Sequence, residues 1–184
     1  MITVGIDEVG RGCWAGPLVA GAVILQAPIQ GLKDSKKLTK ARREQLAAEI
    51  QQNGIVGLGW VEPAEIDEIG LSRAVGLAME RALACIPHDF DEIIIDGSIN
   101  YFPHEARAKA VIKADDSVSA VSAASIVAKV ARDTYMATEA HKLHPEYGFG
   151  KHVGYGTKLH VEMLKLHGVT PLHRKSYKPI MELL

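Results

Sequence analysis

The stretch VGIDEVGRG, residues 4–12, joins a short apolar run to two adjacent carboxylates, Asp7 and Glu8, and then to a Gly-Arg-Gly turn. The β-branched residues at 2–6 predict a strand that ends between the two carboxylates. Glycines and acidic residues also punctuate ordinary surface turns, so a solvated turn after an edge strand is the competing interpretation. Residues elsewhere in the chain are needed to distinguish a functional site from a surface turn.

The composition is that of one folded domain. The chain has 184 residues, of which 47% are hydrophobic, so we expect a single domain over residues 1–184 with a sizeable core. No apolar run is long enough for a membrane span and the N-terminus lacks a signal-peptide pattern, so a cytoplasmic protein is expected. Cys13 and Cys85 have no further ligand at metal-binding spacing, which favours reduced thiols.

The charge is nearly balanced but unevenly distributed. A formal net charge of -1 argues against a protein that coats nucleic acid without specificity. Residues 33–43 are rich in lysine and arginine, however, and the basic segment from His141 onward holds six of the eight histidines. These clusters predict either solvated helix faces or a focused basic surface beside an acidic pocket.

Apolar patterns predict an α/β fold that alternates helices and strands in its second half. Helices are expected at residues 39–54, at 62–87 in two pieces broken near Gly70, and at 117–136, where small residues would let the backbone approach a neighbour closely. A glycine- and tyrosine-rich loop (144–160) and a short helix (157–168) form a helical C-terminal part, from about residue 140 to 184. Further strands are expected at residues 16–26, 55–61, 91–97 and 108–115.

Four acidic positions lie at the ends of apolar elements: Asp7, Glu8, Asp96 and Asp115. Strand ends are where sites form in open α/β sheets, and clustered carboxylates suit Mg²⁺ or Mn²⁺. Adjacent strand residues point to opposite faces, so Asp7 and Glu8 reach one centre only if the strand ends there. Each position also has an ordinary structural interpretation, as a turn residue for Asp96 or a helix cap for Asp115 or its neighbour Asp116.

Five ordered motifs spanning residues 5–160 resemble those of bacterial ribonuclease HII, the type 2 ribonuclease H. They are GIDEVGRGCWAGPLVAGAV (5–23), LKDSKKLT (32–39), IIIDG (93–97), KADDSVSAVSAASIVAKVARD (113–133) and GYGTKLH (154–160). The resemblance implies a ribonuclease H-like fold, with a mixed five-stranded sheet flanked by helices and a C-terminal helical part. It also implies an endonuclease that cuts the RNA strand of RNA–DNA hybrids and cuts 5′ of single ribonucleotides in duplex DNA, by two-metal-ion hydrolysis that leaves 3′-hydroxyl and 5′-phosphate ends.

The resemblance also assigns roles to residues. Asp7, Glu8, Asp96 and Asp115 would bind Mg²⁺ or Mn²⁺, with Asp115 rather than Asp116 favoured by its spacing from Lys113. The backbone of Gly10, Arg11 and Gly12 would read the ribose 2′-hydroxyl, the group that distinguishes RNA from DNA. Tyr155 would stack on the following deoxyribose, while Lys36 and Ser125 would hold the phosphate backbone. Packing of Tyr155 in its loop, a solvated Lys36 and helix packing of Ser125 are the alternatives.

Two other functions compete with this one. Another metal-dependent nuclease of the same fold, such as a junction resolvase or an exonuclease, would need no reader of the 2′-hydroxyl. A nucleic-acid binding module without catalysis would need no complete acidic set, and here all four positions are filled. No motif for binding a sliding clamp is found, and a monomer is expected.

Overall fold

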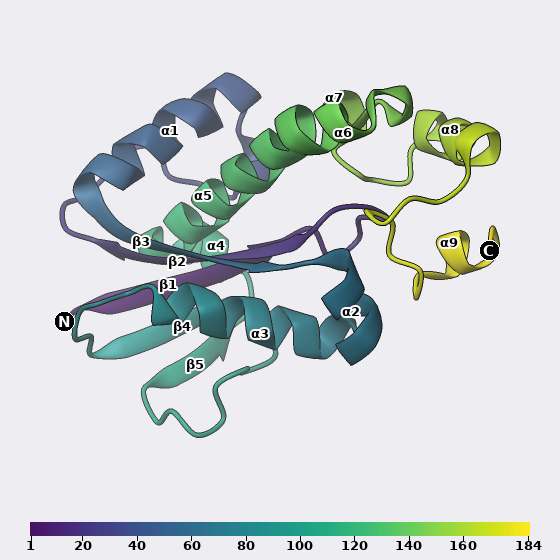
Figure 1. Cartoon of the computed structure of the whole chain (residues 1–184). Coiled ribbons are helices and arrows are strands. Elements are labelled where there is room, and N and C mark those ends of the chain that lie inside the picture. Colours follow the sequence, from purple (N-terminus) through teal and green to yellow (C-terminus); the bar gives the residue numbers. More distant parts are fainter.

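Five strands form one mixed sheet in the order β3-β2-β1-β4-β5 (Figure 1). In this computed structural model, which describes residues 1–184, β1 to β3 are antiparallel neighbours, whereas β4 pairs in parallel with β1 and β5 with β4. The mixed five-stranded sheet predicted from the sequence is therefore confirmed. The strands are β1 (Thr3–Val9), β2 (Leu18–Leu25), β3 (Gly54–Val61), β4 (Glu92–Asp96) and β5 (Ala108–Val111).

Helices cover both faces of the sheet (Figure 1). On one face lie α1 (Lys40–Asn53) and α5 (Ser119–Tyr135), whose apolar residues share a core cluster with Val23 of β2. On the other lie α2 (Pro63–Ile69) and α3 (Leu71–Ala84), which pack on Val4 and Ile6 of β1. Gly5, between Val4 and Ile6, lies instead against Ala120 of α5, so alternate residues of β1 face different helix layers, as the two-residue period of a strand requires.

Small residues bring α5 directly against the first two strands. A Cβ atom at Gly5 would overlap the backbone of Ala120, and one at Gly21 would lie 2.6 Å from the carbonyl oxygen of Ala124. The close approach predicted for this helix is confirmed. It fixes the face of β1 that carries Asp7 beside the buried Ser125 of α5.

Helix boundaries follow the predicted capping residues in the first half of the chain. Thr39 caps α1 by accepting from the amide of Arg42 at 3.3 Å, and Gly70, with a positive φ of 81°, separates α2 from α3. Residues 35–37 add a single 3₁₀ turn, η1 (Ser35–Lys37), before α1.

Three predicted boundaries are wrong. The strand β1 does not end between Asp7 and Glu8, because pairing with β2 continues to Val9. The strand expected over residues 108–115 stops at Val111, and residues 114–117 form a one-turn helix, α4 (Ala114–Ser117). The helix expected to end at residue 136 continues through a π-helical turn, η2 (Met136–Ala140), into α6 (His141–Leu143).

The C-terminal part packs against the turn that follows β1 (Figure 1). Its core joins Ala15 of that turn to Tyr147, Phe149 and Leu164, and an isolated β-bridge pairs Ala15 with His173. The segment predicted as a loop at 144–160 contains two short helical turns. The elements here are η3 (Pro145–Tyr147), α7 (Phe149–His152), α8 (Lys158–His167) and α9 (Lys178–Met181). None of the helices combines the length and apolar character that crossing a bilayer requires.

Candidate active site

One cleft of about 240 Å³ lies at the end of the sheet where the parallel strands β1 and β4 finish. The turn after β1, the end of β4, η1, α4, α5 and the loop before α8 all contribute to it. Val9, Ser35 and Lys129, which the sequence analysis did not name, also line it. It brings together every predicted site residue: Asp7, Glu8, Gly10, Arg11, Gly12, Lys36, Asp96, Asp115, Ser125 and Tyr155.

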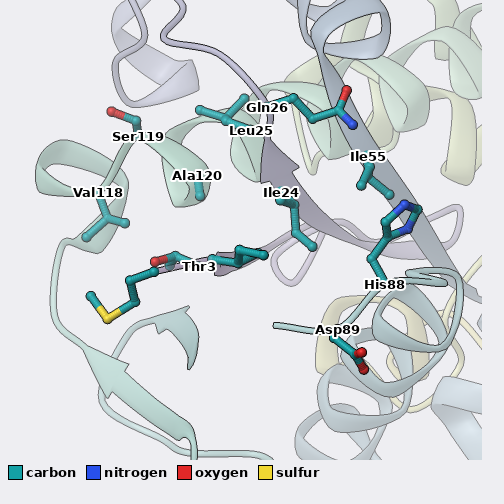
Figure 2. A pocket seen from close by; sticks show the side chains of 12 residues that line it. Thr3, Ile24, Leu25, Gln26, Ile55, His88, Asp89, Val118, Ser119 and Ala120 are labelled. Carbon is teal, nitrogen blue, oxygen red and sulfur yellow. The ribbon is translucent and has the colours of Figure 1, made fainter. Parts of the chain in front are cut away.

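A larger cavity of about 590 Å³ lies at the opposite end of β1, by Thr3 (Figure 2). Ile24, Ile55 and Ala120 border it, and its only ionisable side chains are those of His88 and Asp89. Because these two belong to no group of side chains that could hold a metal ion, the catalytic chemistry is better placed in the smaller, acidic cleft.

Three carboxylates converge in the cleft. Asp7 lies in β1, Asp96 is the last residue of β4 and Asp115 lies in α4, yet oxygens of all three lie within 4.8 Å of one another. The amide of Ala114 donates to Asp96 Oδ1 at 2.8 Å, which ties the start of α4 to the end of β4. The hydroxyl of Ser122 donates to the Asp115 carbonyl at 2.6 Å, which ties α4 to α5. The cluster is therefore held by backbone contacts rather than by contacts among its own side chains.

Crowding opposes the ionisation of two of these carboxyl groups, those of Asp7 and Asp115. Burial raises the pKa of Asp7 well above its ordinary value, and the neighbouring carboxylates of Glu8 and Asp96 raise it further. Burial and Asp96 likewise raise the pKa of Asp115. No lysine or arginine forms an ion pair with Asp7, Asp96 or Asp115. A donor set of carboxylate oxygens alone, without an internal counter-ion, fits a hard divalent cation such as Mg²⁺ or Mn²⁺.

Glu8 lies apart from this group. It points to the face of β1 opposite Asp7, and its Oε1 accepts from Arg11 Nη1 at 3.1 Å. Pairing between β1 and β4 ends at Ile6 and Ile95, so the edge of β1 beyond Ile6 is open on the β4 side and Glu8 still lines the cleft. Burial raises the pKa of Glu8, whereas Arg11 lowers it.

Asp116, the neighbour of Asp115, is engaged elsewhere. Both of its carboxylate oxygens accept from Lys37 Nζ, at 2.5 and 2.8 Å, on the exterior of the protein. The two adjacent aspartates therefore differ in position: Asp115 lies in the cluster and Asp116 does not.

The predicted phosphate-holding residues lie on the α5 side of the cleft. Ser125 is buried beside Asp7, and its hydroxyl donates to Ser35 Oγ at 2.9 Å. Lys36 is exposed on η1, where the Asp34 carboxylate accepts from its amide. Lys129 lies one helical turn after Ser125, so the i,i+4 spacing from a predicted site residue was a signal that could have identified it.

Tyr155 borders the cleft from the C-terminal part. The residue is 38% exposed, and Lys129 Nζ lies 5.4 Å from the centre of its ring. Burial, followed by the nearby Cys13 thiol, raises the pKa of the Tyr155 hydroxyl to about 12. The Tyr155 carbonyl is paired with Nδ1 of His160 at 2.9 Å, so a buried histidine anchors the loop that carries the ring.

Three histidines of the C-terminal part are buried and do not extend a basic surface. His152, His160 and His173 are no more than 6% exposed, and burial lowers the pKa of each, to about 4 for His160 and His173. The basic surface expected from residue 141 onward is therefore wrong for these three positions. Histidines that are neutral at pH 7 contribute no attraction for phosphate.

The comparisons with known proteins agree with one another. The sequence model of the ribonuclease HII family matches residues 4–180. The ribonuclease HII of Shewanella pealeana is 49% identical over 184 residues, covering 98% of this chain and 89% of its own. The ribonuclease H2 structure from Pyrococcus horikoshii has a TM-score of 0.83 and 28% identity, covering 100% of this chain and 97% of its own. Bst-RNase HIII, solved in complex with Mn²⁺, has a TM-score of 0.76, covering 100% of this chain and 69% of its own, and at 21% identity shares the fold.

Proposed function

The chain belongs to the ribonuclease HII family and is a ribonuclease H, and from this premise we propose the substrates and the site residues of its reaction. It hydrolyses the RNA strand of RNA–DNA hybrids and cuts 5′ of single ribonucleotides embedded in duplex DNA, leaving 3′-hydroxyl and 5′-phosphate ends. The observation that carries the proposal is the group of carboxylates from Asp7, Asp96 and Asp115, within 4.8 Å of one another in a cleft open to solvent.

The carboxylates supply the metal-binding part of the site. Asp7, Asp96 and Asp115 would hold the cations, and Glu8 would join them once its contact with Arg11 is released. Two divalent cations bound there, Mg²⁺ or Mn²⁺, would activate a water molecule and stabilise the leaving 3′ oxygen. A nucleophilic side chain is not required.

The other cleft residues would position the nucleic acid. Lys36 and Lys129 line the cleft together with Asp115 and Tyr155 and would pair with phosphates, which fixes the register without reading the bases. Tyr155 is partly exposed and lines the cleft, where its ring would stack on a sugar. The turn of Gly10, Arg11 and Gly12, which also lines the cleft, would contact the ribose 2′-hydroxyl.

The test compares neighbouring aspartates. Asp115→Asn and Asp116→Asn make the same chemical change one residue apart, but only Asp115 belongs to the carboxylate group. We expect Asp115→Asn to lose cleavage of a duplex with one ribonucleotide by several orders of magnitude, and Asp116→Asn to stay near wild type. Equal activity of the two variants at saturating Mg²⁺ would contradict the assignment.

Three duplexes that differ only in sugar content separate the candidate functions. The proposed enzyme cuts the hybrid and the single-ribonucleotide duplex with Mg²⁺ or Mn²⁺, stops after chelation, and leaves all-DNA duplex intact. A polymerase extends its nicked product, because the 3′ end is a free hydroxyl. Cleavage of all-DNA duplex would indicate a different nuclease of this fold, and binding without cleavage would indicate a module that has lost catalysis.

A further inference from the structure

Arg174, in the segment between α8 and α9, is a fully buried guanidinium without an acidic partner. It donates from Nη1 to the carbonyl oxygens of Gly10 at 2.6 Å and Arg11 at 3.2 Å, and from Nε and Nη2 to that of Gly16 at 3.1 and 2.9 Å. Burying an unpaired guanidinium is costly unless its donors are satisfied. Here the acceptors are backbone carbonyls of the turn after β1.

A second contact reinforces the first. Tyr177 Oη accepts from Arg174 Nη1 at 2.8 Å and donates to the carbonyl of Arg11 at 2.6 Å. The carbonyls of Gly10 and Arg11 are therefore both held from the protein interior by residues that lie more than 160 positions later in the sequence.

The geometry of the peptide bond determines where the amides of this turn point. In a trans peptide the N–H of the next residue points opposite to the carbonyl. The carbonyls of Gly10 and Arg11 point at Arg174, so the amides of Arg11 and Gly12 point away from it. Neither amide has an acceptor within the protein, and both residues are exposed, so the two N–H groups are accessible to a ligand. A Cβ at Gly12 would meet no protein atom within 4 Å, so the surroundings of this residue are open.

We propose that Arg174 is a positioning residue that aims the Arg11 and Gly12 amides into the cleft and thereby sets the preference for ribose over deoxyribose. The inference rests on the proposed function, because it concerns how that site distinguishes the two sugars. Two amide donors fixed in direction match the acceptor lone pairs of a 2′-hydroxyl, which deoxyribose lacks.

The test measures a ratio that partial unfolding does not change. Dissociation constants are determined without divalent metal for two duplexes that differ by a single 2′-hydroxyl, and their ratio is the ribose preference of the folded protein. In Arg174→Lys, which loses the forked donor geometry, we expect the preference to fall by roughly fivefold to tenfold, the equivalent of one to two amide hydrogen bonds. Affinity for the all-DNA duplex should change little.

Two further variants complete the design. Tyr177→Phe removes only the hydroxyl that holds Arg11 and should lower the preference by roughly twofold to threefold. Arg132→Lys is the matched control, because Arg132 is equally buried but donates to the carbonyls of Ala15, Pro17 and Val153 instead. Its ribose preference should remain that of wild type.

The outcomes separate the inference from the function on which it rests. Wild-type preference in Arg174→Lys and Tyr177→Phe, or an equal loss in Arg132→Lys, would overturn the positioning role. A wild-type protein without ribose preference would overturn it as well. Cleavage of the ribonucleotide duplex by wild type in Mg²⁺ tests the proposed function separately, because that result does not depend on the ratio.

Discussion

Mild acid should destabilise this protein through a pair of buried histidines. His173 Nδ1 accepts from the Thr170 amide at 2.9 Å, so its proton lies on Nε2 and is donated to His160 Nε2 at 3.0 Å. His160 then carries its own proton on Nδ1 and donates it to the Tyr155 carbonyl at 2.9 Å. The chain of hydrogen bonds requires both rings to be neutral, because protonation of His160 would set two Nε2–H donors against each other.

The magnitude follows from the difference in pKa between the folded and unfolded states. Burial lowers the pKa of His160 and of His173 to about 4, against 6.5 for an unperturbed histidine. Between these values the unfolded chain binds more protons than the folded one, so stability is lost as pH falls. For one such histidine the free energy of unfolding drops by roughly 1 kcal/mol at about pH 5.5 and by roughly 2 to 3 kcal/mol at about pH 4.5, relative to neutral pH.

The assay is urea unfolding of wild type and His173→Gln from about pH 7.5 to about pH 4.5 without divalent metal. Glutamine cannot titrate but can still donate toward His160, so the stability difference between the two proteins should shift in favour of the variant as pH falls. Carboxyl groups with raised pKa values act in the opposite direction, because their stabilising contribution is present in acid and lost as pH rises, but they are common to both proteins and cancel. The exposed His104→Gln is the control and should follow wild type. A difference that stays constant across this range would refute the reasoning.

Five other substitutions, at four positions, test the cleft. Gly12→Ala should leave the urea midpoint unchanged or slightly raised yet impair ribonucleotide cleavage. Gly10→Ala should impair cleavage and also lower the midpoint, because Gly10 has a φ of 96° and an added Cβ would lie 2.5 Å from Nε of the buried Arg132. Equal urea midpoints for the two variants would contradict this. Tyr155→Phe should retain most single-turnover cleavage and Tyr155→Ala should lose at least tenfold, since stacking needs the ring; equal rates for both would remove the ring from the site. Asp7→Asn should abolish cleavage, and it should abolish the rise in melting temperature that Mg²⁺ causes in wild type, without lowering the melting temperature measured in the absence of metal. An undiminished effect of Mg²⁺ on the melting temperature would exclude Asp7 as a ligand.

The sequence predicted the elements better than their ends. Thr39 and Gly70 act through local geometry, as a cap and a break, so the boundaries that they set could be read from the chain. The end of β1 could not, because its pairing to Val9 depends on β2 rather than on Asp7 or Glu8 themselves. Continuation of α5 through residues 136–143 is likewise set by packing, since buried Met136 and Ala140 face the C-terminal core.

The sequence was also informative about which residues gather in the cleft, but not about what supports them. Asp96 and Asp115 follow apolar runs whose ends lie at the same end of the sheet, and this pattern can be recognised in the sequence alone. Arg174 and His173, in contrast, look like ordinary basic residues near a chain end. His173 is paired with the ring of His160, 13 positions earlier, and Arg174 with the carbonyl of Gly10, 164 positions earlier. No local sequence pattern encodes such distant partners.

The charges that line the cleft explain why backbone amides, rather than a charged side chain, would recognise the sugar. Four carboxylates face three cationic side chains there, those of Arg11, Lys36 and Lys129, so a mobile cationic reader beside the cluster is drawn to the acids. Arg11 itself shows this, because its guanidinium is paired with Glu8 at 3.1 Å. The amides of the same turn cannot be captured in this way, since their direction is fixed from behind by Arg174. Backbone amides of fixed direction can therefore recognise a hydroxyl beside the metal-binding cluster. A cationic side chain in the same place would pair with the carboxylates instead.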